Sequence, residues 1–198
     1  MENLIPRDGA IYFYPELFTK EESDRLYETL SAEIAWKQEP IFIMGKSIPQ
    51  PRLTALYGDT DKPYSYSGIT MYSHSWTPAL LEIKSKIEAI AGVKFTNALL
   101  NFYRDGQDSM GWHRDNEKEL GINPVIGSVS FGSPRTFHLK HYQDKTLTTK
   151  ISLTHGSFLL MQGSTQHHWL HSIPKQLKIT GGRINLTFRI IKTASSGL

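Results

Sequence analysis

The sequence has no cysteine, which excludes disulfide bonds, thiolate nucleophiles and zinc or iron–sulfur sites built on Cys ligands. It also has no uninterrupted apolar run as long as a membrane span, and its first residues do not resemble a signal peptide. Internal repeats, low-complexity tracts and runs of five like charges are absent as well. We therefore expect no association with membranes, and a location in the cytoplasm, or in the nucleus if the source is eukaryotic.

The composition is that of an ordinary globular domain. Hydrophobic residues make up 39% of the 198 residues and charged residues 21%. A chain of this size and composition can bury a core without disulfide bonds or structural metal ions. The formal net charge of +3 mildly favours a polyanionic partner. We expect residues 1–198 to form a single domain.

Two helices are predicted from their N-terminal signals. Thr19 and Glu22 fit a capping box that starts the first helix. Thr77 is the expected N-cap of the second helix, with Pro78 at its first position and Gly92 as its stop signal.

From residue 95 onward the pattern changes to short segments rich in β-branched and aromatic residues, separated by Gly, Pro and Asn. Helices followed by strands indicate an α+β fold in which the strands close into a sandwich or barrel. Between the two helices, residues 41–48 and 63–70 are expected to be hairpins or loops. The predicted strands are 95–103, 125–131, 135–140, 147–153, 157–161 and 183–190.

His113 and Asp115 are candidates for metal ligands. If this segment is a strand, residues two apart point to the same side, so the imidazole and the carboxylate lie together. A second histidine would complete the 2-His-1-carboxylate set that holds non-haem Fe(II), and His167, His168 and His171 are all available. The alternative is a histidine that merely hydrogen-bonds its neighbouring carboxylate.

The last predicted strand has two chemically different faces. One carries only apolar residues, and the other carries Arg183, Asn185, Thr187 and Arg189. This alternation is typical of a half-exposed strand. It is also typical of a cavity wall where a guanidinium binds a carboxylate through a bidentate pair of hydrogen bonds.

Six motifs, taken in order, resemble the AlkB-type dioxygenases, most closely the animal-type branch that repairs alkylated DNA. They include Asn-Phe-Tyr-Arg-Asp-Gly, His-Arg-Asp and Trp-Leu-His-Ser-Ile-Pro, and the likeness covers roughly residues 41–191. The motifs occupy residues 101–106, 113–115, 128–132, 153–157, 169–174 and 183–189.

The resemblance implies a double-stranded β-helix (jelly-roll) core over residues 95–192, with helices and a nucleotide-recognition lid of hairpins over residues 1–94. It implies Fe(II), 2-oxoglutarate and dioxygen, with His113, Asp115 and His171 as the metal ligands, His171 standing in the family's Trp-x-His-Ser-Ile-Pro context. The 2-oxoglutarate site would consist of Asn101, Tyr103, Arg183, Asn185, Thr187 and Arg189.

The implied reaction is oxidative dealkylation of N-alkylated bases, such as 1-methyladenine and 3-methylcytosine, in DNA and, as an open extension, in RNA. The alternative is a 2-oxoglutarate-dependent hydroxylase of a protein or small molecule on the same fold. We expect a monomer. The side chains of Arg135, Lys140, Lys175 and Lys178 either contact phosphates or are simply solvated.

The residues expected to bind the substrate base lie in three segments. Met44 stands at the tip of a hairpin where the resembled branch usually carries an aromatic finger, and Asn116 stands where that branch usually has an acid. The full expected set is Met44, Gly45, Lys46, Tyr64, Ser65, Tyr66, Asn116 and Glu117.

Overall fold

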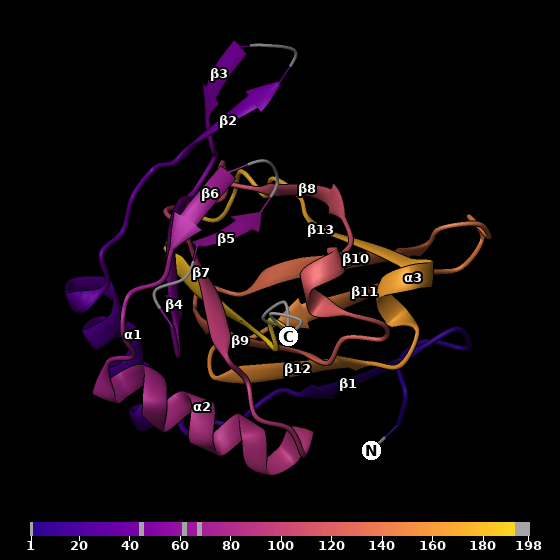
Figure 1. Cartoon of the computed structure of the whole chain (residues 1–198), viewed down its shortest axis with the longest axis horizontal. Helices are drawn as coiled ribbons and strands as arrows, with labels where there is room; N and C mark the ends of the chain where they lie inside the picture. Colours follow the sequence, from indigo (N-terminus) through magenta and orange to yellow (C-terminus); the bar gives the residue numbers. More distant parts are fainter. Residues whose placement is uncertain (1, 44–45, 61–62, 67–68, 193–198) are drawn as a thin grey trace, which may run out of the picture.

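The computed structural model describes residues 2–43, 46–60, 63–66 and 69–192, and the side chains of residues 41–43, 46–47, 63–66 and 69–70 lie outside this description. The described strands form two larger antiparallel sheets and two hairpins (Figure 1). This arrangement is the predicted α+β fold with a double-stranded β-helix core. None of the described helices is long and apolar enough to cross a bilayer.

The larger sheet has six strands, in the order β1 (Ala10–Tyr14), β12 (Ser157–Gln162), β9 (Ile126–Gly132), β14 (Arg183–Arg189), β7 (Asn97–Tyr103) and β4 (Leu53–Gly58). The smaller sheet has four, in the order β11 (Thr148–Leu153), β10 (Arg135–His141), β13 (Trp169–Ile173) and β8 (Met110–His113). Strands β1 and β4 precede residue 95, so the larger sheet draws on both parts of the chain. The sequence patterns did not predict these two strands.

Both long helices begin where their capping signals predicted. In α1 (Lys20–Glu33) the Thr19 side chain accepts a hydrogen bond from the Glu22 N–H, while the Glu22 carboxylate accepts one from the Thr19 N–H. In α2 (Pro78–Ala91) the Thr77 side chain accepts from the Leu80 N–H. Gly92 ends α2 with a φ of 69°, a left-handed conformation that glycine adopts without steric cost.

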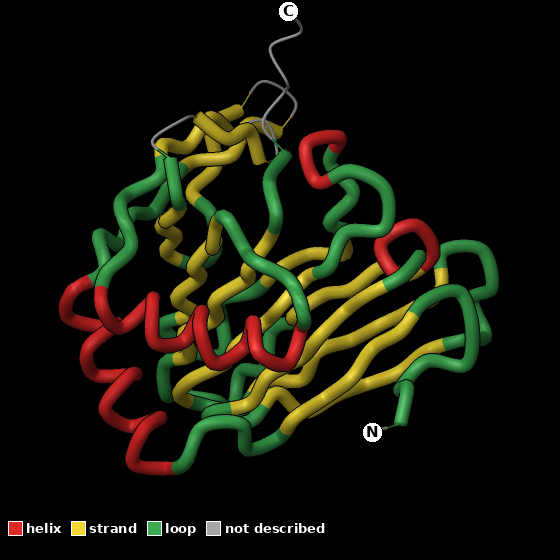
Figure 2. The backbone as a smooth tube through the Cα atoms, turned by 60° about the horizontal axis from the view of Figure 1, so that its bottom comes forward, coloured by secondary structure: helices red, strands yellow, loops and turns green. Residues whose placement is uncertain are grey.

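The two helices cover the outer face of the larger sheet (Figure 2). Ile184, Leu186 and Phe188 of β14 face this helical layer and share a buried apolar cluster with residues of α1 and α2. Because strand side chains alternate, the polar residues of β14 face the space between the two sheets. A second apolar cluster, which includes Phe137, Leu159 and Trp169, fills much of that space.

The two segments expected to be hairpins or loops are hairpins. Strand β2 (Pro40–Ile43) pairs with β3 (Lys46–Pro49), and β5 (Pro63–Tyr66) pairs with β6 (Ile69–Tyr72). Both rise at one end of the molecule (Figures 1 and 2). Two short helical segments, η1 (Lys118–Leu120) and α3 (Thr165–His168), connect strands of the core.

Candidate functional site

The structure brings together His113, Asp115 and His171. Strand β8 ends at His113, and its antiparallel neighbour β13 places His171 directly opposite. The rings of the two histidines lie 4.3 Å apart, centroid to centroid. The potential ligand atoms of all three residues lie within 4.8 Å of one another, which is compact enough for one metal ion.

The ionisation of the three residues suits a divalent cation. The His113 Nδ1–H donates to the carbonyl oxygen of Gly111 at 2.9 Å, which leaves the lone pair of Nε2 available. Burial lowers the pKa of His113, and burial together with His113 lowers the pKa of His171 to about 3. Both imidazoles are therefore neutral at pH 7, as metal ligands must be.

Asp115 remains a carboxylate although it is 1% exposed. Burial raises its pKa, but the positive charge of Arg189 and the hydrogen bond that Arg189 donates outweigh that effect and lower the pKa to about 2. Arg189 donates to Oδ1 at 2.7 Å, and the Asp115 N–H donates to Gln166 Oε1 at 3.0 Å. The other oxygen, Oδ2, lies 4.0 Å from His171 Nε2, on the side of the histidine pair.

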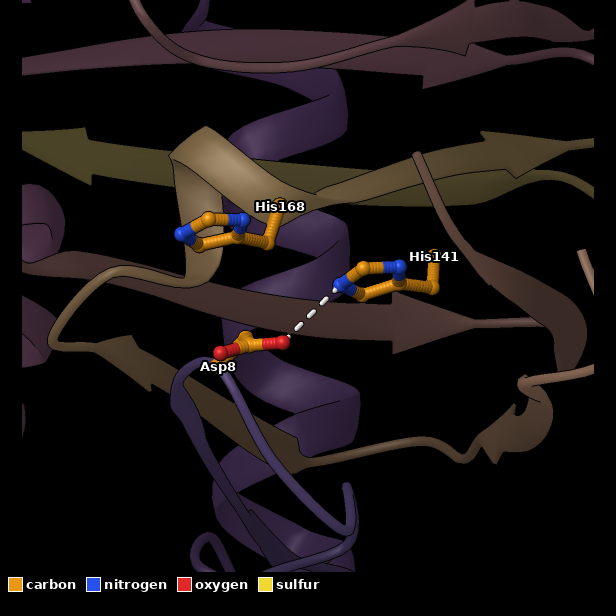
Figure 3. Close-up of side chains that lie close together, drawn as sticks. All are labelled: Asp8, His141 and His168. Atoms are coloured by element: carbon orange, nitrogen blue, oxygen red, sulfur yellow. Dashed lines mark hydrogen bonds and ion pairs between the residues drawn. The ribbon is translucent and has the colours of Figure 1, made fainter. Parts of the chain in front are cut away.

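The other two candidate histidines lie elsewhere. His168 stacks on His141, with ring planes inclined by 2°, and these two residues form a second compact group with Asp8 (Figure 3). His141 Nδ1 accepts a hydrogen bond from the Asp144 N–H, so neutral His141 carries its proton on Nε2, which donates to Asp8 at 3.2 Å. Because both ring nitrogens of His141 are occupied by hydrogen bonds, a metal ion there would have to displace them.

The polar face of β14 is buried, between 1% and 9% exposed, so it lines a cavity and is not a solvated surface. Arg183 donates from Nη2 to Ser130 Oγ, while its Nε and Nη1 are buried with no hydrogen-bond partner among the described residues. Burial lowers the pKa of Arg183 to about 10, so the guanidinium stays charged at neutral pH. No anion therefore compensates the buried charge of Arg183 among the described residues, and a bound carboxylate could do so.

The remaining polar residues of the cavity differ in their free hydrogen-bonding capacity. Asn185 donates to Ser128 Oγ and to the Val129 carbonyl, and its Oδ1 accepts from the Thr187 hydroxyl. Both N–H groups of Asn185 are therefore in use, and the Thr187 hydroxyl donates its proton to the Asn185 oxygen. Asn101 and Tyr103 of β7 line the same cavity as Arg183, Arg189 and the three candidate metal ligands.

Comparisons with known proteins agree with this geometry. Residues 10–189 match the model of the 2OG-Fe(II) oxygenase superfamily. The chain is 37% identical to bovine DNA oxidative demethylase ALKBH2, over 94% of this chain and 71% of that protein. It is 42% identical to rat alpha-ketoglutarate-dependent dioxygenase alkB homolog 3, over 92% of this chain.

The chain belongs to the AlkB-type family of 2OG-Fe(II) oxygenases. It covers less than two thirds of rat and mouse alkB homolog 3, namely 64% and 66% of their lengths. The solved structure of OsALKBH1 has the same fold, with a TM-score of 0.63 at 19% identity. The match covers 93% of this chain and 99% of the OsALKBH1 chain. The predicted family and fold are both confirmed.

AlkB-type oxygenases use Fe(II), 2-oxoglutarate and dioxygen, and the residues of this cavity fit the first two. Two neutral imidazoles and one carboxylate form the donor set that non-haem Fe(II) takes, and they leave coordination positions open. The unpaired N–H groups of Arg183 fit a carboxylate of 2-oxoglutarate, since an anion there would compensate the buried charge.

The residues expected to recognise the substrate of this AlkB-type chain are only partly described. Asn116 is exposed, whereas Glu117 is half-buried and its Oε2 has no hydrogen-bond partner among the described residues. Burial and the nearby charge of Asp115 raise the pKa of Glu117. Met44 and Gly45 lie outside the described residues, as do the side chains of Lys46, Tyr64, Ser65 and Tyr66.

One interpretation from the sequence was wrong, and several neighbours of the cavity were missed. Arg135 is 1% exposed and donates to the backbone carbonyls of Asp105, Asp108 and Pro174, so it holds loops together and does not face phosphates. Gln166 was missed because no motif marks a residue that binds only the backbone of Asp115. The apolar lining was missed as well, and it includes Leu99, Met110, Phe137, Leu153, Met161 and Ile173.

Proposed function

We propose that this chain removes small alkyl groups from nitrogen atoms of bases in nucleic acid by oxidation. The reaction would consume 2-oxoglutarate and dioxygen and release an aldehyde, succinate and carbon dioxide. The observation that carries the proposal is a single cavity that combines the His113–Asp115–His171 set with a buried guanidinium lacking an anion. The relatives named DNA oxidative demethylase support an alkylated base as the substrate.

His113, Asp115 and His171 would hold the iron. When bound together with 2-oxoglutarate and dioxygen, Fe(II) supplies the oxidant that hydroxylates the N-alkyl carbon, after which the hemiaminal collapses to the bare base and an aldehyde. Asp115 supplies the one negative charge, and its hydrogen bond from Arg189 keeps Oδ2 directed toward the histidines. The Gly111 carbonyl fixes His113 in the tautomer whose Nε2 can bind the metal.

Arg183 and Arg189 would act at opposite ends of the cosubstrate. They stand six residues apart on β14, or roughly 20 Å along an extended strand, so their side chains must lean toward each other to reach one small molecule. Arg189 contacts the ligand Asp115, which assigns it to the metal end, and Arg183 to the far carboxylate. Asn101 and Tyr103 would complete the site, while Asn185 and Thr187 hold each other and the neighbouring strand in place.

The substrate base would enter beside Asp115. A base in a duplex cannot reach a buried metal, so it must be flipped out of the stack or be unpaired already. The unpartnered Oε2 of Glu117, two residues after Asp115, is suited to accept a hydrogen bond from an exocyclic amine of the base. By family likeness, 1-methyladenine and 3-methylcytosine are the proposed lesions. Tyr64, Ser65 and Tyr66 would cover the flipped base. Met44, Gly45 and Lys46 would form the hairpin tip that enters the base stack in its place.

Cations outside the cavity support a polyanionic partner. Lys140 Nζ lies 4.1 Å from the ring centre of Trp112, which is 44% exposed, and the Arg114 guanidinium lies 4.6 Å from that of Tyr142. Neither cation forms an ion pair among the described residues. Aromatic rings beside unneutralised cations can stack on bases and attract phosphates at once.

Residues 1–198 are proposed to work as one dioxygenase domain, and the expected monomer stays a prediction. DNA is the proposed substrate, with RNA as an open extension. A location in the cytoplasm, or the nucleus of a eukaryote, stays a prediction.

Succinate production tests the substrate class. We expect a methylated oligonucleotide to stimulate conversion of 2-oxoglutarate strongly, relative to the same oligonucleotide without the methyl group. A protein extract serves as the competing substrate pool. Stimulation by the extract and not by the methylated oligonucleotide would contradict the proposal.

A further inference from the structure

The amide of Asn101 is held in one orientation by a residue from a distant part of the chain. Asn101 is 5% exposed and lines the cavity that contains the candidate metal ligands. Its Oδ1 accepts a hydrogen bond of 2.7 Å from Nε of Arg52, which is also 5% exposed. A guanidinium has donors only, so the oxygen of the amide must face Arg52 and the NH2 group must face away.

The freed NH2 group distinguishes Asn101 from the other amide in the cavity. Asn185 lies directly opposite Asn101 in the β7–β14 register, but both of its N–H groups are already donated to Ser128 and Val129. Asn101 Nδ2 has no hydrogen-bond partner among the described residues. Of the two amides, Asn101 therefore has donors to offer an anion in the cavity.

The backbone holds Arg52 at this place. It immediately precedes β4, whose Thr54 pairs with Asn101, and the carbonyl of its neighbour Pro51 accepts a hydrogen bond from the Ser109 N–H at 3.1 Å. Arg52 Nη1 in turn donates to the Ser109 carbonyl at 3.4 Å. No carboxylate pairs with Arg52 among the described residues, so its geometry is set by Asn101 and by backbone.

We propose that Arg52 is a positioning residue that turns the Asn101 amide so that its N–H groups donate to a carboxylate of 2-oxoglutarate. The inference rests on the proposed function, because it assumes that 2-oxoglutarate binds beside Asn101. Without Arg52, the amide can rotate by 180° and present its oxygen to the carboxylate, and two acceptors repel each other. Arg52 thus acts on the cosubstrate through Asn101.

The test is a double-mutant cycle on 2-oxoglutarate binding to protein loaded with redox-inactive Mn(II), measured by titration calorimetry. Arg52→Met removes the donor at nearly constant side-chain length, and we expect it to weaken 2-oxoglutarate binding roughly ten-fold without lowering Mn(II) affinity, because the positive charge of Arg52 acts on His113 and opposes a cation there. In an Asn101→Ala background the same substitution should have almost no effect, because the amide that it orients is gone. Arg52→Lys keeps a donor without an acceptor, and should recover most of the affinity.

Two results would overturn the inference. One is a 2-oxoglutarate affinity that Arg52→Met leaves unchanged. The other is a loss of 2-oxoglutarate affinity on Arg52→Met that is equally large in the wild-type and the Asn101→Ala backgrounds. If Arg52→Met lowers the melting temperature so far that binding cannot be measured, Arg52→Gln replaces it in both backgrounds and is judged by the same criteria, because a glutamine amide can donate or accept and so does not fix the orientation of Asn101. A wild-type protein that binds 2-oxoglutarate but repairs no methylated base would contradict the proposed function and leave the role of Arg52 intact.

Discussion

The guanidinium of Arg189 donates a hydrogen bond of 2.7 Å to Oδ1 of Asp115, and so joins two residues that are 74 positions apart in the sequence. The contact is buried on both sides, with side chains 4% and 1% exposed. It occupies one carboxylate oxygen and leaves the other for a metal. Arg189 therefore belongs to the support of the metal ligands as well as to the proposed cosubstrate site.

Replacement of Arg189 should weaken metal binding even though Arg189 is not itself a ligand. We expect Arg189→Gln to lower Mn(II) affinity at least ten-fold, since partners that orient metal ligands typically contribute that much. Arg25→Gln is the matched control, because Arg25 pairs with Glu82 on the surface. Equal Mn(II) affinities in wild type and Arg189→Gln, measured by calorimetry, would remove Arg189 from the metal site.

Arg183→Met should affect stability and cosubstrate binding in opposite directions. In the absence of 2-oxoglutarate the buried charge has no anion, so its removal should leave the melting temperature unchanged or raise it. The rise in melting temperature that 2-oxoglutarate causes in the wild type should disappear in the variant. A variant that is destabilised but still stabilised by 2-oxoglutarate would mean that Arg183 is structural.

Glu88 should make folding stability depend on pH. Burial raises the pKa of Glu88, but hydrogen bonds from Lys84, Lys94 and the Phe95 N–H outweigh burial and lower it. A depressed pKa stabilises the fold above the ordinary carboxyl pKa, and that contribution is lost as pH falls through the folded value. Glu88→Gln should lower the free energy of unfolding by about 1–3 kcal/mol at pH 7.

The difference between wild type and Glu88→Gln should shrink as the pH falls below the ordinary glutamate pKa of about 4.3, because the unfolded chain takes up a proton there before the folded protein does. Denaturant unfolding at several pH values measures it. Glu82→Gln, which removes only an exposed partner of Arg25, should change stability little at any pH. A deficit of Glu88→Gln that is constant from pH 7 to pH 3 would show that its charge contributes nothing.

Met44 provides a test of how the base leaves the stack. If Met44 is the tip of an extruding finger, Met44→Ala should slow repair of duplex DNA far more than repair of a single strand, which has no pair to open. Met44→Phe should improve duplex repair, because a rigid ring fills the vacated stack better than a flexible thioether. Both substrates must be compared at one salt concentration. Equal slowing of both by Met44→Ala, together with a lower melting temperature, would identify Met44 as a packing residue.

Features specified by neighbouring residues could be predicted from the sequence. Thr19 and Glu22 predicted the start of α1, and Thr77 with Gly92 predicted both ends of α2, because caps act within one helical turn. The alternation in β14 likewise predicted which residues share a face. It did not predict whether the polar face was buried, since burial of β14 depends on a second sheet formed by other segments.

Contacts between distant segments could not be predicted in this way. Spacing alone left His167, His168 and His171 equivalent; the family context chose His171, and the pairing of β13 with β8 brings it to His113. The bonds from Arg52 to Asn101 and from the Asp115 N–H to Gln166 span 49 and 51 positions, and no local pattern records them. These partners decide how the motif residues are oriented.

Direct conversion of 1-methyladenine to adenine in a defined oligonucleotide tests the central claim. With Fe(II), 2-oxoglutarate and dioxygen, the wild type should yield adenine, formaldehyde and succinate in equal amounts. His171→Ala should yield none of them and should not bind Mn(II), whereas His168→Ala, which alters a neighbouring histidine outside the metal group, should retain activity. Adenine formation by His171→Ala at the wild-type rate, or no conversion by wild-type protein that binds both Mn(II) and 2-oxoglutarate, would contradict the account.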